Sequence, residues 1–458
     1  MTIPITIDAN EPSFPRTEWF VRLTDAGAAT RLPAQIAVTS TVAELAPRHG
    51  DRILGQVNIG FSDRVVLLER TSDAGTEIIS GIELQAIESS GALITYLERV
   101  ISGRSAERTL SVGVVGYGPF GGMGYAQGLA CTETDGLEFV AAVDPSDERR
   151  KAAESDFLGI RTYVDVSEMI EDGGVDVAIV ATPPVHHAEI ATRLLTAGIH
   201  AVVEKPMALT TADAERLITL AASRDLLVTV HQSRRWDRDF LALRAVVEAG
   251  QLGEVFNLET FVGGFGHPCR TWHSEESISG GAIYDWGSHH VDWILQLYGS
   301  MPTTVRCVGH KRVWHDVTNL DQLTLHMMWS DGREATFRQS DIAAIRRPKF
   351  YVQGTTGTLE GHYRPMVTER LEPGRGFVTE ESHHAEAPVD LEIRHLDGSA
   401  VNVKPVRHPG WGFHVNLADH LLLGEPLAVT PDSTRDVVRV LEAGHRSGVE
   451  GGRVITLD

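Results

Sequence analysis

Between about residue 110 and residue 231, short apolar runs alternate with segments in which apolar residues recur at a helical period. The apolar runs that predict strands are Leu110–Gly116, Leu137–Asp144, Val175–Thr182, Ile199–Glu204 and Leu226–His231. The segments that predict helices are Gly122–Cys131, Asp147–Phe157, His186–Ala197 and Ala212–Ser223. Continuous apolar strands that alternate with amphipathic helices indicate a parallel sheet covered by helices on both faces. In such sheets, ligands bind at the carboxyl ends of the strands.

After about residue 250 the pattern changes to strand-like runs with few helices among them. The predicted strands are Val255–Val262, Thr303–Val313, Gln322–Trp329, Glu334–Ser340, Phe350–Gln353 and Leu391–Arg394. One helix is predicted among them near Tyr284–Tyr298, and two more close the chain near Trp411–Leu423 and Ser433–Arg446, the last after a helix-start signal at Thr430. We expect an α+β domain with an open, mostly antiparallel sheet that has one face toward solvent or a partner.

The first 109 residues match neither pattern. Arg52–Phe61 and Arg64–Arg70 predict a hairpin that turns through Ser62-Asp63, and Ala92–Ile101 predicts a helix. We expect a small α+β extension, whose role is either oligomer contacts or covering of the active-site cleft. The predicted domains are therefore 1–109, 110–232 and 233–458, with the alternative that the C-terminal helices pack back on the second domain.

Composition narrows the class of protein. The net charge of −21 argues against a nucleic-acid partner, which favours a basic surface. The three cysteines are widely spaced and form no CxxC pair, which is typical of a reduced, cytoplasmic setting. The first ten residues have neither a basic start nor an apolar core, and no apolar run is long enough to span a membrane. We expect a cytoplasmic protein with a small-molecule partner and neither nucleic acid nor membrane.

A glycine-rich loop follows the first strand of the alternating region. Gly116, Gly118 and Gly121 fit the GxGxxG pattern, in which glycines allow a tight turn, approach to a pyrophosphate and packing of the next helix. Phe120 lies in the same loop and is a further candidate cofactor contact. Asp144 ends the second strand about 20 residues later, where a carboxylate accepts hydrogen bonds from adenosine ribose hydroxyls. Because this charge would repel a 2′-phosphate, the loop predicts NAD and disfavours NADP.

Several further motifs give the chain a resemblance to a known family. They are Gly113-Val114-Val115-Gly116-Tyr117-Gly118, Thr182-Pro183-Pro184-Val185-His186-His187, Ala197 to Pro206 with its Glu204-Lys205-Pro206 end, Arg234-Arg235-Trp236-Asp237, and Gly280 to Asp292. Together they resemble the Gfo/Idh/MocA oxidoreductases from about residue 110 to residue 457. The resemblance implies a Rossmann domain followed by an open sheet, an NAD(P) cofactor, a homo-oligomer and oxidation or reduction of a sugar or cyclitol carbinol. One departure is Pro184, where the family often has asparagine.

The resemblance also suggests which residues act in catalysis. Oxidation of a secondary alcohol needs a base for the hydroxyl proton and a positive donor for the reacting oxygen. Lys205 follows an apolar strand and matches the family lysine that polarises this oxygen. The family also suggests that the bond from Lys205 to the following Pro206 is cis and aims the lysine. Asp285 and His289 are spaced i, i+4, which places both on one helical face. We expect His289 to be the general base, with Asp285 orienting its ring or contacting the substrate hydroxyl.

Other residues are predicted around this centre. Thr182, Pro183, His187 and Glu204 are expected to contact the cofactor or orient the lysine, as the resemblance implies. The candidate substrate-binding residues are Arg235, Trp272 and Tyr284, where the aromatic rings suit the apolar faces of sugars. For Arg235 a structural salt bridge is an equal alternative, and for each aromatic residue so is core packing.

Two alternatives concern the function, and one concerns a metal. The first alternative is an enzyme that, like some relatives, retains NAD and oxidises its substrate transiently so that an elimination or the cleavage of a glycoside can occur. The second is a non-catalytic regulator that binds nucleotide and sugar. His267, Cys269, His273, His289 and His290 would suit zinc or manganese, but their spacing matches no closed zinc motif, so no metal is predicted.

Overall fold

The computed structural model describes residues 5–7, 13–23, 35–43, 45, 47, 52–59, 62–72, 75–82, 108–118, 123–363, 366–372, 376–382, 389–404, 406 and 410–457. The chain divides into two compact units. One comprises residues 1–179 and 407–428, and the other comprises residues 180–406 and 429–458.

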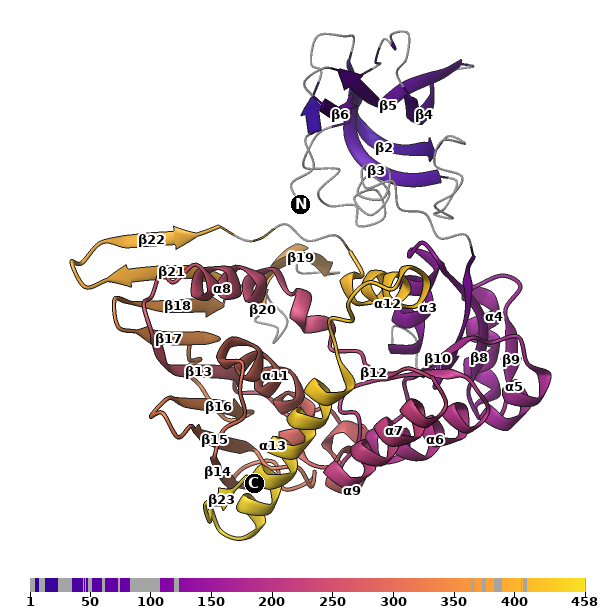
Figure 1. Ribbon diagram of the computed structural model, residues 1–458. Helices are drawn as coiled ribbons and strands as arrows, with labels where there is room; N and C mark the ends of the chain where they lie inside the picture. The colour runs from indigo at the N-terminus through magenta and orange to yellow at the C-terminus, as the bar shows by residue number, and fades with distance from the viewer. Residues whose placement is uncertain are drawn as a thin grey trace. The chain divides into compact units, whose positions relative to one another are not determined.

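Near the N-terminus, six strands form a sheet of their own (Figure 1). In the order β1-β6-β5-β4-β2-β3 they are Ile5–Ile7, Gly75–Ser80, Ser62–Ser72, Arg52–Ile59, Ser13–Leu23 and Gln35–Ala43. The hairpin predicted here is confirmed, but its turn was misplaced: Ser62 pairs with Ile59 and Asp63 with Asn58, so both belong to β5. Residues 60 and 61 alone separate the strands. The helix predicted at residues 92–101 lies outside the described residues.

A second sheet has the strand order β12-β11-β10-β7-β8-β9. Its strands in that order are Val228–Val230, His200–Val203, Val177–Val180, Leu110–Val115, Leu137–Val143 and Arg161–Tyr163. Strand β7 pairs with β8, β8 with β9 and β11 with β12, and all three pairs are parallel. This confirms the parallel sheet, and five of its strands were predicted within three residues of their bounds. The edge strand β9 was not predicted, because its three residues, Arg161 to Tyr163, form no apolar run.

The helices that accompany this sheet are α3 (Met123–Thr132), α4 (Asp147–Asp156), α5 (Val166–Asp172), α6 (His187–Thr196) and α7 (Thr211–Ser223). Two of them begin at side-chain caps: Asp165 accepts a hydrogen bond from the Ser167 amide, and Thr210 accepts one from the Asp213 amide. Such caps satisfy N–H groups that have no partner within the helix. Two short 3₁₀ helices, η2 (Pro184–His186) and η3 (Ser233–Trp236), follow strand ends.

The third sheet has nine strands in the order β22-β21-β18-β17-β13-β16-β15-β14-β23 (Figure 1). In that order they are Ala400–Val403, Val389–His395, Gly357–Tyr363, Phe350–Gly354, Val255–Gly263, Glu334–Ser340, Gln322–Met328, Thr304–His310 and Ile455–Thr456. In this sheet β13 and β16 pair in parallel, and the other neighbouring strands pair antiparallel. The predicted open, mostly antiparallel sheet is therefore confirmed. Two further strands, β19 (Met366–Glu372) and β20 (Gly376–Ser382), pair with each other.

The remaining helices are α8 (Arg238–Glu248), α9 (Glu276–Ser279), α10 (Ala282–Asp285), α11 (Gly287–Tyr298), α12 (Gly412–Leu423) and α13 (Pro431–Val449), with the 3₁₀ helix η4 (Trp272–Ser274). The helix predicted at 284–298 is present, but it is interrupted at Trp286 and begins two residues earlier as α10. Thr430 caps α13 by accepting a hydrogen bond from the Ser433 amide, as its sequence predicts.

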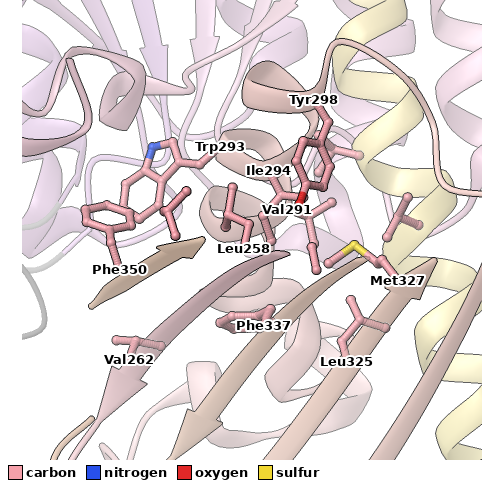
Figure 2. Packing of buried hydrophobic residues seen from close by; sticks show 14 of the residues in the cluster. Leu258, Val262, Val291, Trp293, Ile294, Tyr298, Leu325, Met327, Phe337 and Phe350 are labelled. Atoms are coloured by element: carbon pink, nitrogen blue, oxygen red, sulfur yellow. The ribbon is translucent and has the colours of Figure 1, made fainter. Parts of the chain in front are cut away.

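The main core lies between the nine-stranded sheet and the helices on one of its faces. Val291 and Ile294 of α11 are fully buried and belong to one cluster with Phe337 and Leu325 of the sheet. Figure 2 shows these side chains directed toward one another from helix and strands. Trp293 contacts Phe350 with ring centroids 5.3 Å apart. This packing fixes α11, and therefore His289, over β16.

Candidate active site

Lys205 and Asp285 meet although they are 80 residues apart in the chain. Lys205 follows β11, and the Lys205–Pro206 bond is cis. The lysine Nζ lies 2.5 Å from Asp285 Oδ1 and 3.3 Å from the Asp285 carbonyl oxygen. The two side chains are 23% and 29% exposed, so the ion pair is half-buried and open to a ligand.

Asp285 is the last residue of α10, and its carboxylate is directed to the lysine. Burial acts to raise the pKa of Asp285, but the charge and hydrogen bond of Lys205 outweigh it and leave this pKa below its usual value. The carboxylate therefore stays charged near neutral pH. The expectation that Asp285 orients the His289 ring is not met within the described residues, because the Asp285 carboxylate contacts Lys205 and no hydrogen bond joins it to that ring. The helical spacing from which it was inferred is interrupted at Trp286.

His289 lies in the first turn of α11 and is 6% exposed. Its Nδ1 is buried without a hydrogen-bond partner among the described residues. Burial, together with the positive charges of Lys205 and Arg234, holds the pKa of His289 well below its usual value. The imidazole is therefore neutral near pH 7 and can accept a proton. Because the charge of Lys205 contributes to this lower pKa, the lysine amine lies close enough to the imidazole to interact with it electrostatically.

Buried polar groups hold the backbone on both sides of Lys205. The Glu204 carboxylate contacts His231 Nδ1 at 2.9 Å and accepts a hydrogen bond from the Lys205 amide at 3.3 Å. His187, which is fully buried, contacts the carbonyl oxygens of Pro206 at 2.8 Å and Thr182 at 2.7 Å. In this structure Glu204, His187 and Thr182 thus surround the lysine backbone, while Pro183 precedes η2.

The two adjacent arginines have different surroundings. Arg235 is buried and makes a bidentate ion pair with Asp292, with Nε–Oδ2 at 2.8 Å and Nη2–Oδ1 at 2.6 Å. This contact supports the structural alternative considered for Arg235. Arg234 instead lies over the Trp286 ring at 4.9 Å and acts electrostatically on both Asp285 and His289. Of the pair, Arg234 is the one beside the candidate site.

The two aromatic candidates also differ. The Tyr284 side chain is buried and its hydroxyl donates a hydrogen bond to the Leu209 carbonyl oxygen at 2.8 Å. Trp272 is partly exposed and stacks on His273, with ring centroids 3.6 Å apart. His273 in turn interacts electrostatically with Asp285 and Lys205, and its pKa is lowered mainly by burial. Trp272 is therefore near the candidate site, whereas Tyr284 already has a protein partner.

The first part of the glycine loop has the geometry that its motif predicts. Gly116 and Gly118 have φ values of 94° and 71°, which favour glycine. The Gly118 amide donates a hydrogen bond to Asp144 Oδ2 at 3.0 Å, and nothing lies within 4 Å of a Cβ placed on Gly118. Open backbone at Gly118 and a carboxylate at the end of β8 fit a dinucleotide, which would be held by these residues. Phe120 and Gly121 lie outside the described residues.

Among the described residues, no group of three or more His, Cys, Asp or Glu side chains is placed to hold a metal ion. His267 is paired instead with Asp316, at 2.9 Å. No helix in the described part of the chain is long and apolar enough to cross a membrane.

One residue near the site was missed by sequence reasoning. Asp341 follows β16 directly, and its charge environment includes Asp285. Its place immediately after a strand was the available signal, since ligands gather at strand ends. The sequence analysis considered strand ends as ligand sites in the parallel sheet and not in the antiparallel one.

Comparisons with known proteins agree with the fold. Residues 110–232 match the model of the oxidoreductase family with an NAD-binding Rossmann fold, and residues 240–360 match the GFO/IDH/MocA C-terminal domain. The chain is 25% identical over 357 residues to scyllo-inositol 2-dehydrogenase (NADP(+)) of Bacillus subtilis, which covers 77% of this chain and 97% of the relative. It is 27% identical over 320 residues to 2,7-anhydro-N-acetylneuraminate hydratase of Mediterraneibacter gnavus, covering 67% and 83%.

The solved structure of an NAD-binding protein from Listeria innocua is also similar, with a TM-score of 0.64 at 25% identity over 76% of this chain and 97% of that one. The first family model covers the glycine loop and Lys205, and the second covers Asp285, which contacts Lys205. The chain belongs to the Gfo/Idh/MocA family of NAD-binding oxidoreductases.

Proposed function

We propose that this protein is an NAD-dependent oxidoreductase that interconverts a secondary alcohol and a ketone on a sugar, glycoside or cyclitol. The observation that carries the proposal is the Lys205–Asp285 contact of 2.5 Å, close to a buried histidine that is neutral at physiological pH. A cationic donor and a neutral base are the two groups that oxidation of an alcohol requires.

Each residue has a distinct role in this proposal. Lys205 donates a hydrogen bond to the reacting oxygen and stabilises the negative charge that develops there. His289 accepts the hydroxyl proton, for which its lowered pKa keeps it unprotonated. Asp285 holds the lysine ammonium in place through their ion pair. When bound, the nicotinamide cofactor supplies the acceptor for the hydrogen that leaves carbon with its electron pair.

The choice of NAD over NADP rests on Asp144. Its carboxylate accepts hydrogen bonds from the amides of Gly118 and Ser146 at 3.0 and 2.9 Å, which fixes a negative charge at the end of β8. A 2′-phosphate would be repelled by this charge. The Bacillus relative is named as an NADP(+) enzyme, so cofactor preference differs within the family.

A second candidate keeps the same site but gives no net oxidation. One relative is named a hydratase, which favours a sequence in which transient oxidation and addition or elimination would be followed by return of the hydride from the retained cofactor to the product. Cofactor that copurifies with the protein and does not need replacement during turnover supports this second candidate. Accumulation of reduced cofactor with substrate supports the first.

The test is turnover of a panel of sugars, glycosides and cyclitols by wild type and by two variants, Lys205→Ala and His289→Ala. We expect each variant to lose about 10²- to 10⁴-fold in kcat. Lys404→Ala and His315→Ala change exposed residues outside the site and serve as matched controls. Retention of full turnover by both site variants would show that these residues do not act in catalysis.

A further inference from the structure

The packing of α11 on β16 determines what lies beyond the end of that strand. The Tyr298 hydroxyl, at the end of α11, donates a hydrogen bond to the Glu334 carbonyl oxygen, at the start of β16, at 2.8 Å. The ring of His290, in the first turn of α11, lies 4.8 Å from the Phe337 ring. Helix and strand therefore run in opposite directions. The residues after Ser340 extend past the start of α11, toward Asp285.

Side chains on β16 alternate between two faces of the sheet. Ala335, Phe337 and Gln339 are buried on the face that α11 covers, whereas Thr336 and Arg338 line grooves on the open face. Because strand side chains alternate with a period of two, Asp341 continues the covered face.

The Asp341 backbone is held firmly, but its carboxylate is not. The Asp341 amide donates to the Asp321 carbonyl oxygen at 2.8 Å, and the Asp341 carbonyl accepts from Gly266 and Trp314 at 3.1 Å each. No hydrogen bond or ion pair joins its carboxylate to another described residue. Asp321 next to it, by contrast, is bonded to Lys311 and to two backbone amides.

This carboxylate lies in an unfavourable environment. Burial raises the pKa of Asp341 to about 6, the negative charges of Asp285 and Asp321 act in the same direction, and Lys311 opposes them. A carboxylate that keeps such a position without a protein partner costs stability, which is typical of functional positions.

Two other buried polar atoms, one on the covered face of β16 and one on α11, are also without partners among the described residues. Gln339, which is 8% exposed, has a buried Oε1 with no hydrogen bond, and so does Nδ1 of His289 in the described structure. Buried polar atoms in proteins almost always have partners. Unpartnered polar atoms on β16 and in the first turn of α11 indicate that a polar ligand completes this region.

We propose that Asp341 is a substrate-binding residue, whose carboxylate accepts hydrogen bonds from hydroxyl groups of a neutral polyol held at Lys205, Asp285 and His289. The inference rests on the proposed function and adds a preference to it. Because Asp341 and Asp285 are both negative, the site favours neutral sugars and cyclitols over sugar acids.

The test compares wild type with Asp341→Asn on scyllo-inositol, myo-inositol, glucose and glucuronate. Loss of charge-assisted hydrogen bonds should raise KM for the best neutral substrate about 10- to 100-fold, with kcat changed much less. The ratio of kcat/KM for neutral over anionic substrates should fall. The melting temperature should not fall, because the amide removes an uncompensated charge. Asp331→Asn, at an exposed carboxylate in the β15–β16 turn, is the matched control.

Asp341→Ser is a second variant, and the same rise in KM is expected for it. An unchanged KM in both variants overturns the inference, while the proposed function stands if Lys205→Ala is inactive. A lower melting temperature with unchanged KM assigns Asp341 a structural role and likewise overturns it. If wild type acts on no member of the wider sugar and cyclitol panel, the proposed function fails, and this inference with it.

Discussion

Lys205 owes its position to contacts that act on its backbone as well as on its amine. Glu204 and His187 hold the peptide groups around it, and Asp285 holds Nζ. The sequence motifs predicted the lysine and the acid, because both stand in distinctive runs. Their direct contact was not predicted, since the spacing of Asp285 and His289 suggested a different pair. Which arginine lies at the site was not predictable either, because Arg234 and Arg235 differ only in their tertiary partners.

At Asp144 we expect a single substitution to change cofactor preference. Asp144→Ser removes the negative charge at the end of β8 while keeping a short polar side chain. Loss of a repulsion of about 1.4 kcal/mol between this carboxylate and a 2′-phosphate corresponds to a tenfold change. The ratio of kcat/KM for NADP to that for NAD should therefore rise about tenfold or more. Steady-state kinetics with both cofactors measures the ratio. A wild type that already prefers NADP would contradict the assignment of NAD.

Buried histidines should make stability depend on pH. Burial lowers the pKa values of His187, His289 and His290 from the usual value of 6.5. The unfolded chain therefore binds more protons than the folded one below about pH 6.5. Stability is fully present above that pH and falls as the pH decreases toward the folded pKa values, by about 1.4 kcal/mol per pH unit and histidine.

The measurement is the melting temperature at pH 7.5 and pH 5.5. His290→Phe should reduce the difference between the two, because His290 is buried against Trp293 and Phe337 and has no proposed catalytic role. His315→Gln, at an exposed position, should leave it unchanged. Asp341 has the opposite effect on stability. Because its pKa is raised in the folded state, its protonation between pH 6 and 4 stabilises the folded chain as the pH falls. A flat profile for wild type would contradict the argument.

At the level of elements, the sequence predicted segments with a clear apolar pattern, whereas β2, β3 and α8 were not predicted although each has nine or more residues. Strands β7, β8, β13 and β16 were predicted because their apolar runs are continuous or alternate clearly. Helix α5 has seven residues, too few for a helical period to emerge. Strand β18 carries Gly357 and Gly361, and glycine weakens a strand pattern. Pairing such as that of β13 with β16 depends on contacts that no local pattern encodes.

The Arg235–Asp292 ion pair joins η3 to α11, and we expect it to stabilise rather than to bind substrate. Arg235→Ala leaves Asp292, which is 2% exposed, as an uncompensated buried charge. The free energy of unfolding should fall by about 3–5 kcal/mol. Urea denaturation measures this change, and Arg238→Ala at an exposed neighbour should have an effect below about 0.5 kcal/mol. Unchanged stability with a large rise in KM would instead support the substrate-binding role first predicted for Arg235.

On the scale of the whole molecule, each face of the nine-stranded sheet has a different environment. One face packs on α11 and forms the core shown in Figure 2. On the other, Arg338 and Arg347 line open grooves together with Glu259 and Glu360. A face that carries both signs of charge can pair with a second copy of itself, since a two-fold axis brings arginine of one copy to glutamate of the other.

We therefore expect a homo-oligomer that associates through the Arg338–Arg347 face. Arg338→Glu combined with Arg347→Glu places four acidic side chains around the groove that Glu259 and Glu360 also line, so two copies should repel each other and the mass in light scattering should fall toward that of one chain. Arg224→Glu, at an exposed residue after α7, is a matched reversal that should leave the mass unchanged. Because Lys205, Asp285 and His289 all belong to one unit of one chain, the dissociated variant should retain most of its kcat. A wild type that is monomeric, or a double variant that stays associated, would exclude this face as the interface.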